Sequence, residues 1–415
     1  MTGRPRYRSK GKSVRFAYTK EQEALRQAVI AFIDENVDDE LRGELVREEF
    51  QRRRGPRTRE FYARLTERGW MAISWPREFG GQGGSRIDQY IVEEELARAG
   101  LPITRGGGGV PAIAAHGTPE QKSEFIKPAV NDDVYFALGF TEPDAGADLA
   151  GISCRAVRDG DDYIVNGQKM FTSAAHDATH IYLMVRTDPE AERHSGLSIL
   201  LVPIATPGIT VTPLRTVQND PVAPPGTTYG TPRTNMVYFD DVRVPVSARL
   251  GAENAGWSIG QSGLNLDRVG ANRYLISVHL TEDVVNLARD DEQVGARLAA
   301  DPVARDTLAE LWIEAQVCRL FTMRSMSMAE RGEPFTYQAS AEKVWAPEHG
   351  VKATEQVAQL LGPLAQLLNG SADAVESGLF AHNLLGAYQS GINHGSVQLM
   401  RDQVARKGLG LPRSR

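Results

Sequence analysis

Residues 140–148 read FTEPDAGAD, and the pattern of the sequence changes at this segment. Before it, apolar residues recur at the spacing of helices. After it, short apolar runs are separated by prolines and glycines, which is typical of strands. Beyond about residue 255 the helical spacing returns. We therefore predict an α+β chain in which a β domain lies between two helical parts.

The length, net charge and cysteine count of the chain limit the kinds of protein it can be. Its 415 residues exceed what one hydrophobic core usually serves, so two or three domains are expected. The net charge of −6 argues against a nucleic-acid-binding protein, which would carry a basic face. Two cysteines, Cys154 and Cys318, are too few for a disulfide framework or a metal cluster, and they favour a reducing, cytoplasmic location. The sequence has no apolar run long enough to cross a membrane.

Two start signals mark helices in the N-terminal part. Thr19 with Gln22, and Thr118 with Gln121, have the spacing of a capping box, in which each side chain satisfies a backbone N–H group. Pro119 stands at the first helical position, where proline is favoured.

The first fifteen residues carry six basic residues and no acidic one, which is typical of a disordered basic tail.

The middle part contains a hairpin signal. Residues 163–165 and 169–171 flank Asn166-Gly167, a dipeptide that favours a tight hairpin turn. These runs predict a compact, mostly antiparallel β domain. Further strands are predicted at residues 181–185, 197–202 and 236–239, and a loop rich in proline and glycine at 217–235. In the C-terminal part, helices are predicted near residues 256–290, 301–331, 337–368, 371–387 and 395–406.

These patterns place the domain boundaries. We expect a basic tail at residues 1–15, an N-terminal helical domain at 16–138, the β domain at 139–250 and a C-terminal helical domain at 251–415.

One predicted helix carries small residues around an acid. The helix is predicted to run through Ala271, so that Gly263, Gly270 and Ala271 share the face of Asp267. Gly260 extends this face by another turn. Because each glycine costs a helix about 1 kcal/mol relative to alanine, something must offset that cost. Two interpretations stay open: close helix packing with Asp267 paired to an arginine, or a groove for a flat ligand with Asp267 as a general base.

Four segments, in order and at matching spacing, resemble the signatures of the acyl-CoA dehydrogenase family. They are FTEPDAGAD at 140–148, GQKMFTS at 167–173, FDDVRVP at 239–245 leading into 251–257, and the C-terminal stretch 395–413. The resemblance extends from about residue 16 to 413. It implies an oxidoreductase that holds FAD, acts on an acyl-CoA and passes electrons to an acceptor such as an electron-transfer flavoprotein. It also implies a homo- or hetero-oligomer, either a dimer or a tetramer.

The resemblance implies roles for individual residues. The isoalloxazine and ribityl chain of FAD would be held by Phe140, Thr141, Phe171, Thr172 and Ser173, with Phe171 where most members have tryptophan. Further FAD contacts would be Ser396 and Gln398 near the active site and, from a neighbouring subunit, Gln359, Gly362 and Pro363. The substrate-binding residues would be Ala147, Arg268 and Gly395.

The implied reaction removes two hydrogens from an acyl thioester. A carboxylate takes the α-proton, and the β-hydride goes to flavin N5. A ribityl hydroxyl and a backbone N–H would bond the thioester carbonyl where charge develops.

The chain departs from the family pattern at the catalytic base. His394 occupies the position of the usual C-terminal glutamate. Some members carry the base instead on the helix after the β domain, and that position is Asp267. Aspartate is one methylene shorter than glutamate, and a neutral imidazole is itself a base near pH 7. The sequence therefore leaves Asp267, His394 or neither as the base.

A second departure concerns the FAD pyrophosphate. Asp291 stands where many members have an arginine that crosses a subunit interface. Either Arg289 or Arg297 replaces it, or the chain pairs with a different subunit. Two alternatives to a dehydrogenase stay open. The loss of the usual glutamate allows a flavin-dependent monooxygenase on the same fold, and the altered pyrophosphate contact allows a non-catalytic subunit of a heteromer.

Overall fold

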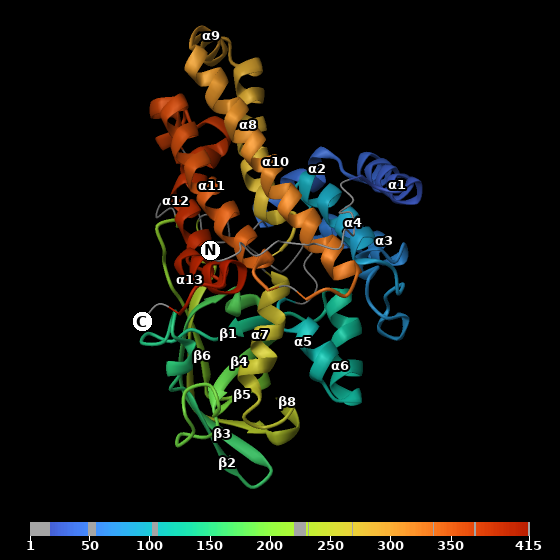
Figure 1. Cartoon of the computed structure of the whole chain (residues 1–415), viewed down its shortest axis with the longest axis vertical. Coiled ribbons are helices and arrows are strands. Elements are labelled where there is room, and N and C mark those ends of the chain that lie inside the picture. Colours follow the sequence, from blue (N-terminus) through green and yellow to red (C-terminus); the bar gives the residue numbers. More distant parts are fainter. Residues whose placement is uncertain are drawn as a thin grey trace, which may run out of the picture.

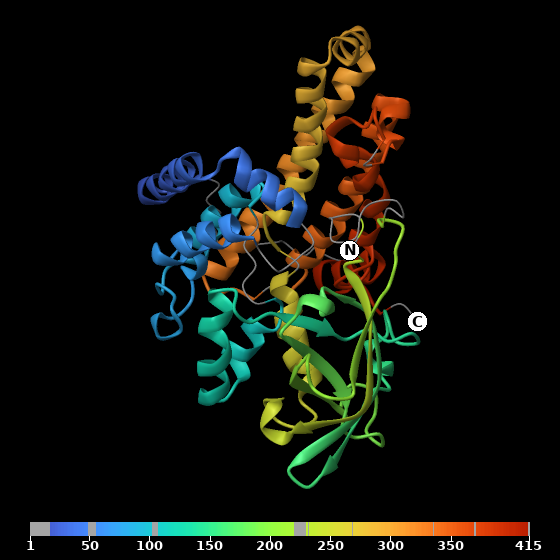
Figure 2. The ribbon, with the colours of Figure 1, turned by 180° about the vertical axis from the view of Figure 1, so that it is seen from behind.

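The computed structural model describes residues 17–48, 55–101, 107–219, 230, 232–267, 269–334, 336–368 and 371–413. Helices, a β sheet and a long helical bundle follow one another along the chain, which confirms the predicted α+β order. The bundle stands on the β domain, and the N-terminal helices pack beside both (Figures 1 and 2). The predicted tail at 1–15 and most of the predicted loop at 217–235 lie outside the described residues.

The N-terminal helices begin where their caps predict. Both capping boxes are confirmed, because Thr19 accepts from Gln22 N at 3.2 Å and Thr118 accepts from Gln121 N at 3.2 Å. A shared core that includes Phe32 and Leu65 holds the first helices together. The helices are α1 (Lys20–Asn36), α2 (Asp39–Glu48), α3 (Pro56–Glu67), α4 (Arg86–Arg98), α5 (Val110–His116) and α6 (Pro119–Val130).

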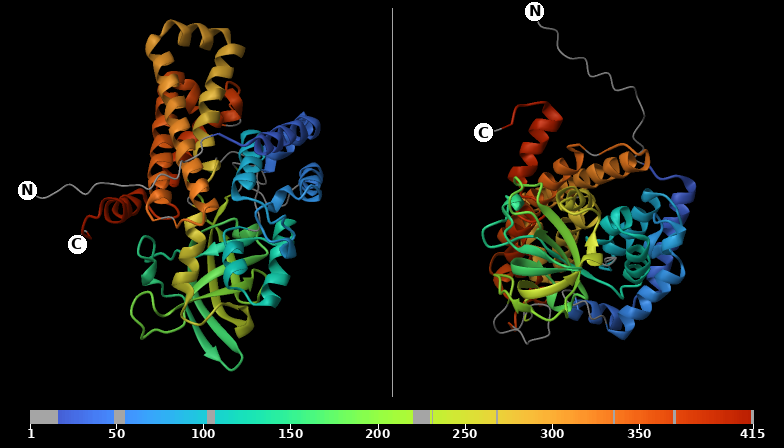
Figure 3. Two further views of the ribbon diagram at one scale, coloured as in Figure 1. Left: turned by 45° about the vertical axis from the view of Figure 1, so that its right-hand side comes forward. Right: turned by 90° about the horizontal axis from the view of Figure 1, so that it is seen from below.

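The middle domain is one strongly curved sheet (Figure 3). Its hydrogen-bonded order is β6-β7-β3-β2-β4-β5-β8, with β1 beside β4. The pairs are antiparallel except β1–β4 and β2–β4. The strands are β1 (Phe136–Gly139), β2 (Arg155–Asp159), β3 (Asp162–Ser173), β4 (His180–Arg186), β5 (Leu197–Pro203), β6 (Ile209–Pro213), β7 (Thr234–Pro245) and β8 (Arg249–Leu250).

The predicted hairpin at Asn166-Gly167 is wrong. Strand β3 runs through this dipeptide, and the register against β7 shifts there by a bulge. Gly167 has φ +141°, and a Cβ on it would lie 2.8 Å from Cys154 Cα, so the strand needs glycine at this point. The chain turns earlier instead, between β2 and β3, where Gly160 has φ +62°.

The C-terminal part forms the bundle and the helix that leads into it. Its helices are α7 (Gly256–Asp267), α8 (Asn272–Asp290), α9 (Glu292–Ala300), α10 (Pro302–Glu330), α11 (Gln338–Leu361), α12 (Leu379–Ala387) and α13 (Val397–Gln403). Helix α9 was not predicted, and α12 begins at Leu379, later than expected. In the described part of the chain, no helix is both long and apolar enough to cross a bilayer.

The single helix predicted over 256–290 is also wrong. Helix α7 ends at Asp267, and α8 begins at Asn272. Gly270 lies between them with φ +147°, which is not a helical conformation. Gly270 and Ala271 therefore do not share a continuous helix face with Asp267.

Candidate active site

The first signature segment is fixed against strand β3. The main chain of Met170 donates a hydrogen bond to Thr141 O at 2.8 Å. Lys169 Nζ donates to Phe140 O at 3.1 Å. The structure thus brings the start of the segment that follows β1 beside the last residues of β3, as the assignment of both to one flavin requires.

A buried ion pair holds these two segments together. Lys169 Nζ lies 2.7 Å from Glu142 Oε1, and both side chains are buried. Glu142 also accepts hydrogen bonds from Ser153 N at 2.7 Å, Ser153 Oγ at 2.8 Å and Cys154 N at 2.9 Å. With these partners the carboxylate is satisfied without water.

The pKa values of the pair follow from burial and from these bonds. Burial raises the pKa of Glu142, but the charge of Lys169 and the hydrogen bonds outweigh it, so the pKa lies below its usual range. Burial lowers the pKa of Lys169, against the opposing influence of Cys154 and Glu142. We conclude that Glu142 is ionised at neutral pH and anchors the segment.

Phe171 is presented outward at a second bulge in β3. The register against β7 shifts between Lys169 and Thr172, and Phe171 has φ +57°. This left-handed conformation costs a non-glycine residue roughly 1–2 kcal/mol. Even so, the ring is 56% exposed, which is unusual for a residue of this size on a sheet. An exposed, strained aromatic ring beside Thr141 suits the face of a flat cofactor such as a flavin.

The neighbours of Phe171 differ in what they present. Ser173 is half-buried, and Ala147 in the preceding segment is exposed. Thr172 is fully buried, and no partner is found for its hydroxyl. A cofactor beside this strand would therefore meet the main chain of Thr172 and not its side chain.

We call residues 140–142 and 169–173 the platform. Helix α7 packs directly on it at Phe140. A Cβ at Gly260 would lie 2.7 Å from Met184 Cε and 3.8 Å from Phe140 Cζ. At Gly256 it would lie 2.7 Å from the Ser198 main chain. These glycines serve close packing, so the groove interpretation fails at Gly260. The side chain of Asp267 and the whole of Arg268 lie outside the described residues.

A buried acid on α11 holds the turn after Asp267. Glu342 Oε1 accepts a hydrogen bond from Gly270 N at 3.2 Å and another from Thr322 Oγ1 at 2.6 Å. Its Oε2 lies 3.3 Å from Ser325 Oγ. Burial raises the pKa of Glu342 to about 7, although these bonds and the charge of Arg273 oppose the rise.

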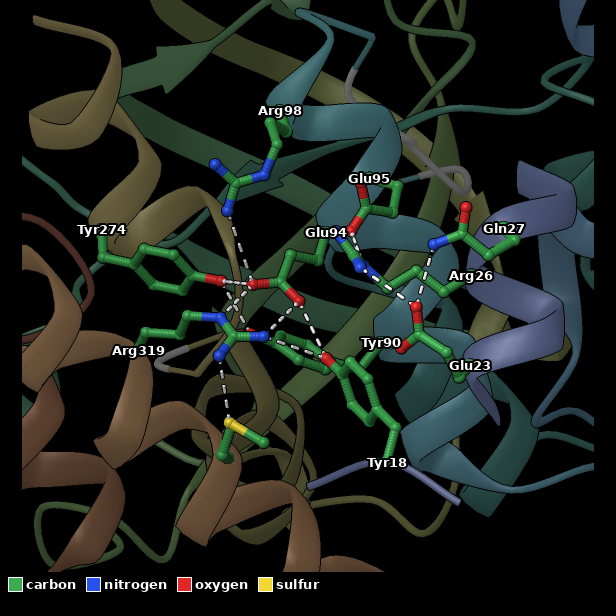
Figure 4. Close-up of polar contacts among 11 residues, drawn as sticks. Tyr18, Glu23, Arg26, Gln27, Tyr90, Glu94, Glu95, Arg98, Tyr274 and Arg319 are labelled. Atoms are coloured by element: carbon green, nitrogen blue, oxygen red, sulfur yellow. Dashed lines mark hydrogen bonds and ion pairs between the residues drawn. The ribbon is translucent and has the colours of Figure 1, made fainter. Parts of the chain in front are cut away.

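A second buried acid holds the start of α8 (Figure 4). Glu94 of α4 accepts hydrogen bonds from Tyr274 at 2.5 Å and from Tyr18 at 2.9 Å, and it pairs with Arg319 of α10. Tyr90 contacts the Tyr274 hydroxyl at 2.7 Å. Burial alone would raise the pKa of Glu94, but Arg319 and the tyrosines lower it overall. The network ties the N-terminal helices to the bundle beside the α7–α8 turn.

The C-terminal signature begins in a strained turn. His394 has φ +52° and Gly395 has φ +92°, and Ser396 then caps α13 by accepting from Leu399 N at 3.4 Å. Lys343 Nζ donates to Ser390 O and, at 3.2 Å, to Asn393 Oδ1. Thus α11 holds the loop that carries His394. Gln398 is exposed on α13.

The remaining predicted FAD contacts lie elsewhere. Gln359, Gly362 and Pro363 sit at the C-terminal end of α11, whose 24 residues span about 36 Å. The start of α11 contacts α13 through Ser340 and Gln403, next to the β domain (Figure 1). One chain therefore does not bring this cluster to Phe171. Exposed Arg297 joins the cluster by donating to Leu361 O at 3.4 Å.

Comparisons with known proteins agree with this architecture. Models of the acyl-CoA dehydrogenase N-terminal, middle and C-terminal domains match residues 19–133, 137–229 and 254–409. Acyl-CoA dehydrogenase FadE26 of Mycobacterium tuberculosis is 34% identical over 97% of this chain and 100% of its own length.

Two solved structures are similar over nearly their whole length. The chain matches the Tcur3481-Tcur3483 steroid ACAD with a TM-score of 0.81 and 32% identity, over 96% of this chain and 99% of that one. It matches the ChsE4-ChsE5 complex from Mycobacterium tuberculosis with a TM-score of 0.81 and 34% identity, over 96% and 100%. The chain therefore belongs to the acyl-CoA dehydrogenase family of FAD-dependent oxidoreductases.

Proposed function

We propose that the chain takes part in FAD-dependent α,β-dehydrogenation of an acyl-CoA whose acyl group is a steroid or a steroid fragment. The observation that carries the dehydrogenation is Phe171, an exposed and strained ring beside Thr141 on a platform fixed by the Lys169–Glu142 pair. The steroid-type acyl group rests on the likeness to a structure described as a steroid ACAD.

The residues of the platform would bind and orient the cofactor. FAD, when bound, supplies the two-electron oxidation of the Cα–Cβ bond. Phe171 would lie against the flavin ring. Thr141 and Ser173 would offer hydroxyls to its edge, whereas Phe140 and Thr172 would contribute main-chain groups because their side chains are buried.

Proton removal requires a base next to this platform. Asp267 is the last residue of α7, the helix that packs on Phe140 through Gly260. We assign the removal of the substrate α-proton to Asp267. His394 remains the rival. In either case the main-chain N–H groups of His394 and Gly395 would polarise the thioester carbonyl, a role that needs no particular side chain. Ala147 and Arg268 would contact the substrate.

A second subunit would complete the cofactor site. Gln359, Gly362 and Pro363 lie at the far end of α11 from the platform, so we propose that they contact the FAD of another subunit. Arg297, which reaches Leu361 O, would take over the phosphate contact that Asp291 cannot make. Two of the similar structures are described by pairs of chains, which supports a hetero-oligomer. We further propose an electron-transfer flavoprotein as the electron acceptor.

The proposal is tested by anaerobic reduction of the purified flavoprotein, alone and co-produced with its natural partner chain. We expect the yellow absorbance to bleach with a steroid-like CoA thioester, and faster than with straight or branched thioesters of equal concentration. A protein that binds no FAD even with its partner refutes the proposal. A flavin-loaded protein that no acyl-CoA of the panel bleaches does the same.

A further inference from the structure

Helix α11 carries two consecutive buried charges that point to different segments. Glu342 and Lys343 are both fully buried. Consecutive residues on a helix are about 100° apart, so the two side chains leave α11 in different directions. Neither contact was expected from the sequence.

The first direction leads to the α7–α8 turn. Glu342 Oε1 accepts from Gly270 N, which lies three residues beyond Asp267. Thr322 and Ser325 of α10 hold the same carboxyl group from its other side. The turn is therefore connected through one side chain to two long helices of the bundle.

The second direction leads to the loop before α13. Lys343 Nζ donates to Ser390 O and to Asn393 Oδ1, which directly precedes His394. The turn formed by His394 and Gly395 needs two residues in the left-handed region, so it depends on external anchors. One helical turn of α11 thus holds both segments in which the base and the carbonyl-binding main chain were placed.

We propose that Glu342 is a positioning residue that sets the place of Asp267 relative to the His394–Gly395 turn, with Lys343 as the anchor of that turn. This inference rests on the proposed dehydrogenation. Its physical basis is that a displacement of about 1 Å between a base and the reacting carbon costs roughly a hundredfold in rate. Glu342 touches neither substrate nor cofactor in this account, and it acts through Gly270.

A purely structural role would be served better by another residue. Burying an acid costs stability, and an apolar side chain of similar volume is often as stable or more stable. An apolar side chain, however, leaves the Gly270 N–H without its acceptor. Glutamine keeps a carbonyl oxygen for Gly270 and Thr322 and can donate to Ser325, so it tests whether the acceptor or the charge matters.

The test compares three substitutions at this position with a control in the full-length protein, purified with its partner chain if one is needed for FAD. Glu342→Ala removes the acceptor. Glu342→Asp keeps the charge but withdraws it by one methylene. Glu342→Gln keeps the acceptor. The control is Glu310→Gln, which also joins α10 to α11, through Lys352 at 2.9 Å, but lies on the exposed face.

Two readouts separate positioning from folding. With bound FAD equal to the parent, Glu342→Ala and Glu342→Asp should bleach roughly ten- to a hundredfold more slowly at saturating substrate, with little change in the half-saturating concentration. Amides of residues 268–274 should exchange with deuterium at least about tenfold faster in both. Glu342→Gln and Glu310→Gln should stay within about threefold of the parent in both readouts.

Particular outcomes overturn the inference. It is wrong if Glu342→Asp bleaches at the parent rate, or if Glu342→Gln is as slow as Glu342→Asp. It is also wrong if exchange at residues 268–274 is unchanged in Glu342→Asp, a result that needs no substrate. If the parent itself never bleaches, the proposed function fails, while the exchange data still decide whether Glu342 anchors the turn.

Discussion

Replacing Lys169 with methionine should loosen the flavin platform. The substitution keeps much of the side-chain volume but leaves Glu142 buried without its cation. Removing one partner of a buried pair typically costs about 3–5 kcal/mol. Glu142 retains hydrogen bonds from Ser153 and Cys154, so we expect the lower end of this range, about 3 kcal/mol.

The loss is best measured locally, because a multidomain flavoprotein does not unfold in two states. Native-state hydrogen exchange in peptides that cover residues 140–154 and 162–173 should quicken roughly a hundredfold, and bound FAD should fall. Arg243→Met breaks an exposed pair with Asp159 and Asp162 and should change exchange by less than about fivefold.

A double substitution completes this test. Adding Glu142→Gln to Lys169→Met removes both charges and should recover much of the lost protection. If Lys169→Met exchanges like the parent and keeps its FAD, the ion pair does not hold the platform.

Three further predictions concern single groups. Burial raises the pKa of Glu342 from 4.5 to about 7, and Arg273 of α8 and the neutral Cys318 of α10 lie near its carboxyl group. A raised pKa means that the folded state favours the protonated acid. The stabilising contribution of Glu342 is therefore complete below pH 4.5 and is lost as pH rises through 7. Native-state hydrogen exchange around Gly270, corrected for the intrinsic exchange rate at each pH, should show a loss of protection on the order of 3 kcal/mol between pH 4.5 and 8 that Glu342→Gln lacks. Equal pH profiles would contradict the raised pKa. Phe171→Ala should weaken FAD binding about 2- to 10-fold in a titration. The apoprotein should melt at an unchanged temperature, because the ring is 56% exposed and contributes little to packing. An unchanged affinity for FAD would show that the ring does not contact the cofactor. Arg297→Ala should weaken FAD binding and reduce its dependence on salt, and a salt dependence equal to that of the parent would exclude a phosphate contact.

The parts of the fold that sequence predicted are those fixed locally. The two capping boxes depend on residues three apart, β4 has a continuous apolar run at 181–185, and β5 is apolar except for Ser198 in its run at 197–202. The Asn166-Gly167 hairpin failed because a glycine with positive φ can serve a bulge in a continuous strand as well as a turn. What distinguishes the bulge is Cys154, which immediately precedes the neighbouring strand β2 and leaves no room for a Cβ.

Long-range partners explain the remaining misses. The helix expected over 256–290 breaks at Gly270, whose N–H bonds Glu342 from 72 residues away. The Lys169–Glu142 pair joins residues 27 apart and was missed, although a signal existed. In β3 the buried positions are Tyr163, Val165, Lys169 and Thr172, and a lysine at a buried position requires a buried partner.

The sequence predicted which segments belong to the candidate site, but not how the packing of the chain arranges them. The main chain of Thr141 meets that of Met170, the residue before the exposed Phe171, whereas the roles of these residues toward FAD stay predictions. No local pattern could show that the end of α11 lies far from them in the same chain, because this depends on the packing of the whole bundle.

The most direct measurement is anaerobic stopped-flow bleaching of Asp267→Asn, a substitution of equal shape that cannot accept the proton. With Asp267 as the base, we expect a normal flavin spectrum and a bleaching rate at least about a hundredfold below the parent, whereas His394→Ala should lose less than about tenfold. An Asp267→Asn protein that bleaches at the parent rate, or a His394→Ala protein that alone loses bleaching, would contradict this assignment.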